Sequence, residues 1–92
     1  MIAVLQIGNS DNKLTQNEWS HFVHGIQQCV AECGIEIHFF GTSQGDAPWQ
    51  NACWVCSVIE PDIDKFQEEV TRIRKSFRQD SVAVVIGDVR SW

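Results

Sequence analysis

Apolar residues recur along this chain with two different periods, and these periods predict its secondary structure. In two stretches they return every three or four residues, which is the spacing of one face of an α-helix. Four other stretches, residues 2–7, 35–41, 52–59 and 82–86, have the alternating, β-branched or aromatic composition of β-strands. The two helical stripes are Trp19, Phe22, Val23, Ile26, Val30 and Cys33, and then Ile63, Phe66, Val70, Ile73 and Phe77.

Capping signals indicate where the two helices begin and end. Thr15 and Glu18 have the spacing of a capping box, in which each side chain bonds the backbone N–H of the other residue. Gly34 stands where a left-handed residue would end the first helix. Asp62 follows Pro61 and is expected to cap the second helix.

The predicted order is strand, helix, strand, strand, helix, strand, and it indicates the fold. This is the ferredoxin-like β-α-β-β-α-β plan, an α+β class with a four-stranded antiparallel sheet and two helices on one face. Strands 2–7 and 52–59 should be central in the sheet. Residues 1–92 are expected to form a single domain, because 92 residues suffice for one core but not for two.

Three polar segments far apart in sequence should meet at one edge of this sheet. The topology brings residues 8–14, 42–51 and 78–81 to the same end, together with the start of the first helix. We call this end the rim. Its candidate ligand-binding residues are Asn9, Ser10, Asp11, Lys13, Trp49, Gln50, Asn51, Arg78, Gln79 and Asp80.

These residue types suit a small anionic, nucleotide-like ligand. Trp49 offers a stacking face, while Arg78 and the free N–H groups of the first helix would hold the anion. The polar edges of the ligand would form hydrogen bonds with the side-chain amides of Gln50, Asn51 and Gln79. A structural interpretation stands beside this one, because such residues also form turns and complement helix dipoles.

The sheet face that no helix covers is predicted to be apolar. Strand 52–59 carries apolar residues on both of its sides, so its outward side chains should form a patch that a homodimer would cover. The alternative is a protein inhibitor that binds a host protein through that face or through the rim. The candidate interface residues are Phe40, Trp54, Cys56 and Val58.

Composition and charge narrow the classes of partner. With 43% hydrophobic and 21% charged residues and no apolar run of the length that a membrane span needs, we expect a cytoplasmic protein. A start that reads as a strand rather than a signal peptide favours the same location. The net charge of -5 argues against general binding to the nucleic-acid backbone.

Neither a metal nor another cofactor is expected. Cys29, Cys33, Cys53 and Cys56 should be reduced and packed as small apolar residues. The last two point to opposite sides of one strand and cannot bind the same ion.

The sequence favours binding over catalysis. It contains no nucleophile elbow, glycine-rich phosphate loop or His-based metal motif. A small hydrolase built on Asp11, Asp46 and Asp80 at the rim remains a weaker alternative.

Three sequence blocks resemble a family of small uncharacterised proteins of bacteria and their phages. They are GNSDNKLTQNEW at residues 8–19, APWQNA at residues 47–52 and RQDSVA at residues 78–83. The family has no assigned activity, so the resemblance implies no catalytic residues. It implies a setting in which a compact domain sequesters a ligand or blocks a host protein.

Overall fold

The chain has the predicted architecture. A computed structural model describes all residues except 10, 12, 34–35, 45–48 and 89. The order β-α-β-β-α-β and the four-stranded antiparallel sheet confirm the ferredoxin-like class. The elements are β1 Ile2–Gly8, α1 Gln16–Cys33, β2 Glu36–Thr42, β3 Asn51–Ser57, a 3-10 turn Glu60–Asp62, α2 Ile63–Ser76 and β4 Ala83–Gly87.

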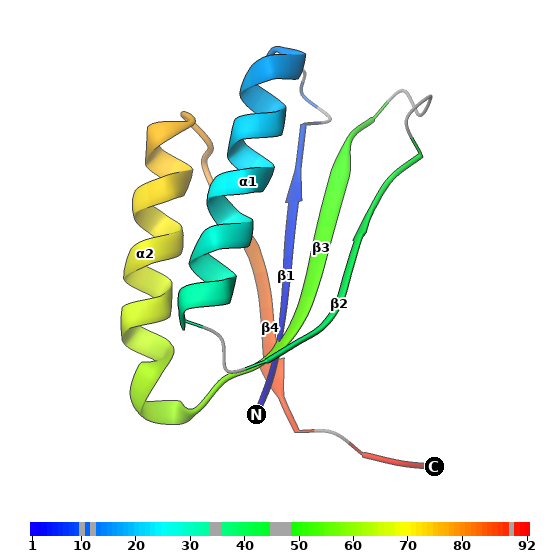
Figure 1. Ribbon diagram of the computed structural model, residues 1–92, viewed down its shortest axis with the longest axis vertical. Coiled ribbons are helices and arrows are strands. Elements are labelled where there is room, and N and C mark those ends of the chain that lie inside the picture. The colour runs from blue at the N-terminus through cyan, green and yellow to red at the C-terminus, as the bar shows by residue number, and fades with distance from the viewer. Residues whose placement is uncertain (10, 12, 34–35, 45–48, 89) are drawn as a thin grey trace.

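The sheet has the strand order β2-β3-β1-β4, so the predicted central strands are central. Both helices lie on the same side of it (Figure 1). Among the described residues, no helix has the length and apolarity that crossing a membrane requires.

The core lies between the two helices and the sheet. Ala3, Leu5 and Ile7 of β1 point toward the helices and are at most 3% exposed. From the helices, the apolar stripes supply Phe22 and Ile26 of α1 among others. The remaining buried apolar residues are Leu14, Cys29, Val30, Ala52, Trp54, Cys56, Val58, Phe66, Val70 and Ile73.

Three of the four predicted interface residues belong to this core, so their assignment to the uncovered face is wrong. Trp54, Cys56 and Val58 are at most 1% exposed. In the register, Trp54 pairs with Leu5, and cross-strand partners share a face of the sheet. The fourth residue, Phe40, packs on Trp54 with ring centroids 5.1 Å apart, which places it on the helix side too.

The reason for this error is the composition of β3. A strand has two faces related by a period of two, and both faces of β3 carry apolar side chains. The pattern therefore leaves open which face the helices cover. In the structure, Trp54 Nε1 donates a hydrogen bond to Gln27 Oε1 on α1, which a residue on the other face could not do.

The face away from the helices, which we call the open face, is nevertheless apolar. One row of paired residues crosses all four strands: Phe39 of β2, Val55 of β3, Val4 of β1 and Val85 of β4. Phe39 and Val85 are 56% and 68% exposed, and the two central residues are half-buried. The predicted apolar patch is therefore present, with different residues.

The helix ends agree in part with the capping signals. Thr15 Oγ1 accepts from the Glu18 backbone N–H at 3.1 Å, and Glu18 Oε1 accepts from the Thr15 N–H at 3.1 Å, which confirms the capping box. Asp62 is the N-cap residue of α2, but its side chain makes no capping hydrogen bond. The cap predicted at Gly34 lies outside the described residues.

Candidate functional site

The three polar loops meet at one end of the molecule, as the topology predicts. In Figure 1 the ends of β1, β2 and α2 lie at the upper end of the molecule, together with the starts of α1 and β3. The Asn9 backbone N–H donates to the Gln50 carbonyl at 2.8 Å, which joins the first loop to the second. Lys13 Nζ lies 3.5 Å from Asp80 Oδ2, which joins the first loop to the third.

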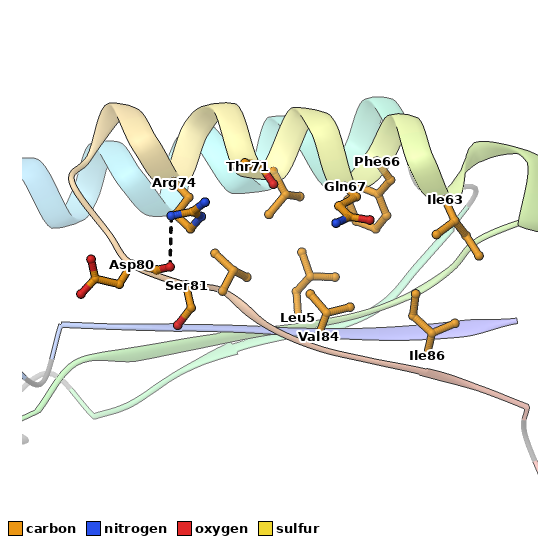
Figure 2. A pocket seen from close by; sticks show the side chains of 12 residues that line it. Leu5, Ile63, Phe66, Gln67, Thr71, Arg74, Asp80, Ser81, Val84 and Ile86 are labelled. Atoms are coloured by element: carbon orange, nitrogen blue, oxygen red, sulfur yellow. Dashed lines mark hydrogen bonds between the residues drawn. The ribbon is translucent and has the colours of Figure 1, made fainter.

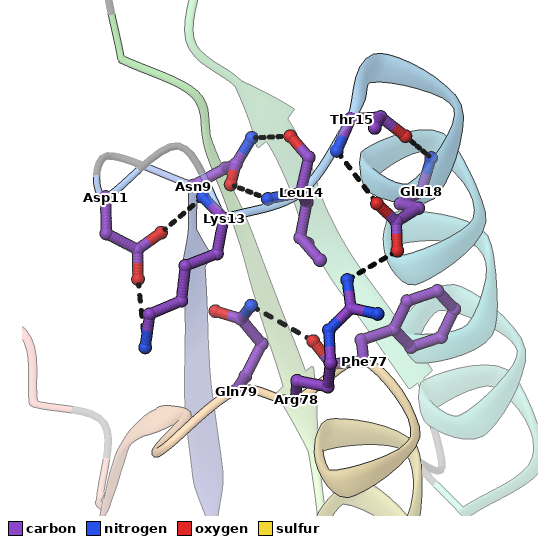
Figure 3. A network of polar contacts seen from close by, with 9 residues as sticks. All are labelled: Asn9, Asp11, Lys13, Leu14, Thr15, Glu18, Phe77, Arg78 and Gln79. Carbon is purple, nitrogen blue, oxygen red and sulfur yellow. Dashed lines mark hydrogen bonds and ion pairs between the residues drawn. The ribbon is translucent and has the colours of Figure 1, made fainter.

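Asn9 holds the first loop together. The residue is only 4% exposed. It donates to the Leu14 carbonyl and accepts from the Leu14 N–H, both at 3.0 Å (Figure 3). Because a buried amide needs such partners, this residue is occupied by the turn and does not face a ligand.

Gln50 is also bonded within the protein. Its Oε1 accepts from Asn9 Nδ2 at 3.0 Å and from Gln16 Nε2 at 3.2 Å, and its own Nε2 donates to Gln16 Oε1 at 2.8 Å. The Gln50 side-chain amide, predicted to bind a ligand, therefore joins the β2–β3 loop to the start of α1 by hydrogen bonds.

Arg78 forms an ion pair within the protein, which offsets the charge that was expected to hold an anion. Its Nη2 lies 2.6 Å from Glu18 Oε2 (Figure 3). The Thr15 backbone N–H and then the Arg78 guanidinium hold the pKa of the Glu18 carboxyl below its ordinary value. The capping box also satisfies one of the helix N–H groups that were expected to bind the anion, that of Glu18.

Lys13 lies between two carboxylates, which offset its charge. Its Nζ is 3.8 Å from Asp11 Oδ2 and 3.5 Å from Asp80 Oδ2. All three side chains are substantially exposed, so the pairs are screened by water and are weak. The cations expected to attract an anionic ligand thus face carboxylates.

The rim still contains a hollow of about 370 Å³. Its carboxylate and amide groups suit ligand hydroxyl or amine groups better than an anion. Trp49 is 53% exposed but does not line this hollow as the structure describes it, and Ser10 and Asp46 lie outside the described residues. The lining residues are Gln6, Ile7, Gly8, Asp11, Asn51, Gln79, Asp80, Ser81 and Ala83.

Known proteins share the fold of this chain at low sequence identity. No protein-family model and no curated protein matches the sequence. The structure is similar to the de novo designed protein Foldit4, with a TM-score of 0.65, 11% identity and 97% coverage of both chains. It is also similar to a dimeric ferredoxin-like protein of unknown function from Thermobifida fusca. That match has a TM-score of 0.61 and 12% identity, and it covers 91% of this chain and 86% of the other. These likenesses show the fold alone.

The cysteines are free thiols in the structure. Burial, reinforced by the neighbouring Cys33, raises the pKa of Cys29 to about 12, and burial raises the pKa of Cys56 as well. Within the described part of the chain, no three His, Cys, Asp or Glu side chains are grouped so that they could hold a metal ion.

Sequence reasoning missed a second cavity, which lies between α2 and β4. We call it the α2–β4 groove, and it measures about 610 Å³ (Figure 2). The signal in the sequence is the run Ala83, Val84, Val85 and Ile86, which is apolar on both faces of a strand at the edge of the sheet. Arg74, near the end of α2, lines the groove and was not among the candidate site residues.

Proposed function

We propose that the protein is a binding protein that works as a homodimer, with a second copy covering the open face of the sheet. The observation that carries this proposal is the apolar row Phe39, Val55, Val4 and Val85 across the open face. Soluble monomers rarely leave such a contiguous patch in water.

The distribution of polar groups supports the same assembly. On the other side of the sheet, α1 and α2 cover the central strands β1 and β3, whereas no helix covers the same strands on the open face. Polar residues lie toward the ends of the strands, at Glu36 and Gln6, and His38 bonds Ser57 near the edge. An apolar centre with a polar margin is the usual arrangement of an interface. The Thermobifida fusca protein of similar fold is described as dimeric, which adds to this support.

Two adjacent valines of β4 provide the test. Val85 lies on the open face, whereas Val84 points toward the helix side. We expect size-exclusion chromatography with light scattering to show a dimer for the wild type and for Val84→Asp, and a monomer for Val85→Asp. Both substitutions replace a valine of β4 by aspartate. A difference between the two variants must therefore come from the face on which each residue lies and not from damage to the strand.

A monomeric wild type across the accessible concentration range would contradict the homodimer. The open face would then be assigned to a different protein, which is the inhibitor hypothesis in the bacterial or phage setting. Equal dissociation by both valine substitutions would also contradict the assignment to the open face.

The rim hollow supports a second candidate function, binding of a small polar ligand. Three loops supply amides and carboxylates around this hollow. A nucleoside-like ligand could use these groups, whereas an additional phosphate would meet Asp11 and Asp80. We expect a nucleoside to raise the melting temperature more than its phosphorylated form does, and Asp80→Asn to reduce this difference. Unchanged melting temperatures across a panel of both would rule out the rim site.

A further inference from the structure

The α2–β4 groove is an apolar cavity at the edge of the sheet. Val84 and Ile86 point toward the helix side, but α2 leaves them 46% and 39% exposed. Phe66 and Val70 of α2 line the opposite wall. The volume of about 610 Å³ falls in the range of roughly 300–1,000 Å³ that small-molecule sites occupy.

The groove changes in polarity from one end to the other. Figure 2 shows Ile63, Phe66 and Ile86 toward one end, and Arg74 with Asp80 toward the other. A ligand that fits both ends would need an apolar body and a polar head. The charged groups at the polar end of the groove determine the sign of the charge that this head should carry.

Arg74 is a positioned cation at that end. Its Nη1 donates to the carbonyl oxygens of Gln79 at 2.8 Å and Asp80 at 3.1 Å, which holds the guanidinium in place. A guanidinium has five N–H donors, so further donors remain for a ligand.

The charge of Arg74 is also less neutralised than the charges of the two arginines nearest to it in sequence. Arg72 pairs with Glu69 and Arg78 pairs with Glu18, but Arg74 makes no ion pair with the residues that the structure describes. The Asp80 carboxylate is 93% exposed and faces Lys13, while only its backbone carbonyl contacts Arg74 (Figure 2).

We propose that the α2–β4 groove binds an amphipathic carboxylate. The apolar chain of the ligand lies between Phe66 and Val70 on one side and Val84 and Ile86 on the other, and its carboxylate pairs with Arg74. Burial of a hydrocarbon chain supplies the affinity, and a charge-assisted bond at Arg74 sets the orientation. This inference goes beyond the proposed function, because it requires neither the rim nor a second subunit.

Three probes whose hydrocarbon chains differ by at most one carbon separate charge from apolarity: decanoate, decan-1-ol and decyltrimethylammonium. Titration of isotope-labelled protein, followed by amide chemical shifts, reports both affinity and location. We expect decanoate to bind most tightly and to shift resonances of α2 and β4. Equal affinities for the three probes, shifts confined to other surfaces or no binding of decanoate would each overturn the proposal.

Matched variants test the residues. We expect Arg74→Gln to lower the affinity for decanoate by about tenfold or more and to leave the affinity for decan-1-ol unchanged. Arg72→Gln, two residues earlier on the same helix and outside the groove, should retain wild-type affinity. Arg74→Lys keeps the charge and should recover part of the loss, which guards against misreading a folding defect. Equal effects of the Arg72 and Arg74 substitutions would contradict the assignment.

For ligand binding, the two valine substitutions in β4 are expected to have effects opposite to those on dimerisation. Val84→Asp should abolish binding of decanoate, and Val85→Asp should not. The proposed homodimer can therefore fail without affecting this result, and the reverse also holds. If Val84→Asp dissociates a dimer that Val85→Asp leaves intact, the groove is a subunit interface and the ligand proposal is wrong.

Discussion

Arg78 and Glu18 are 60 residues apart in sequence, yet Arg78 Nη2 lies 2.6 Å from Glu18 Oε2. Their contact joins the end of α2 to the first turn of α1. The same carboxylate accepts the Thr15 N–H in the capping box. A residue predicted to hold an external anion therefore links the two helices.

This ion pair predicts a pH dependence of stability. The Thr15 N–H and Arg78 lower the pKa of Glu18 in the folded state, so its charged form stabilises the fold above the ordinary carboxyl pKa of 4.5. That contribution is lost as the pH falls through the lowered pKa. We expect Arg78→Gln to reduce the melting temperature at neutral pH, with the difference shrinking in acid. A difference that persists unchanged at the lowest pH would contradict this account, and Glu68→Gln on the exposed surface of α2 is the control.

Asn9 should contribute to stability and not to ligand binding. Asn9→Ala removes the partners of both the N–H and the C=O of Leu14. We expect a loss of about 1–3 kcal/mol in the free energy of unfolding, measured by urea denaturation. Asn17→Ala, at an exposed position of α1, should change it by less than about 0.5 kcal/mol. Similar values for the two variants would show that the Asn9 bonds are not important.

Two tryptophans should differ sharply in their response to the same substitution. Trp54 is fully buried and donates to Gln27, whereas Trp49 is 53% exposed. Trp54→Phe should cost about 1–3 kcal/mol, because it leaves the Gln27 amide oxygen without this donor. Trp49→Phe should have little effect on the same denaturation curve. If Trp54→Phe instead dissociated a dimer without lowering stability, the assignment of Trp54 to the core would be wrong.

The four thiols should react with iodoacetamide at different rates. Cys29 is 4% exposed and its pKa is raised to about 12, so little reactive thiolate forms. Cys53 is half-buried on the open face. In the Val85→Asp variant, whose open face is expected to be free of a second copy, peptide mapping after limited alkylation should find Cys53 modified roughly a hundredfold or more faster than Cys29. In denaturant the rates should converge, and equally fast labelling in the folded protein would contradict the burial of Cys29.

Local sequence features predicted much of the fold. The apolar periods, the capping box at Thr15 and the order of the elements led directly to the ferredoxin-like plan. They also predicted that the three polar loops share one end of the sheet, which Asn9, Gln50 and Lys13 confirm by their contacts. These features depend on residues close in sequence and on general rules of chain topology, so the sequence alone is sufficient to predict them.

The sequence by itself therefore determined the elements, their order and the shared rim, because helical and strand periods arise from local backbone geometry. Only the tertiary structure decided which side of β3 meets the helices, since both sides are apolar and packing against α1 selects the side with Trp54. It also decided that Arg78 and Gln50 bond within the protein while Arg74 faces a groove. Such partners are chosen by distances between side chains remote in sequence, which no local pattern encodes.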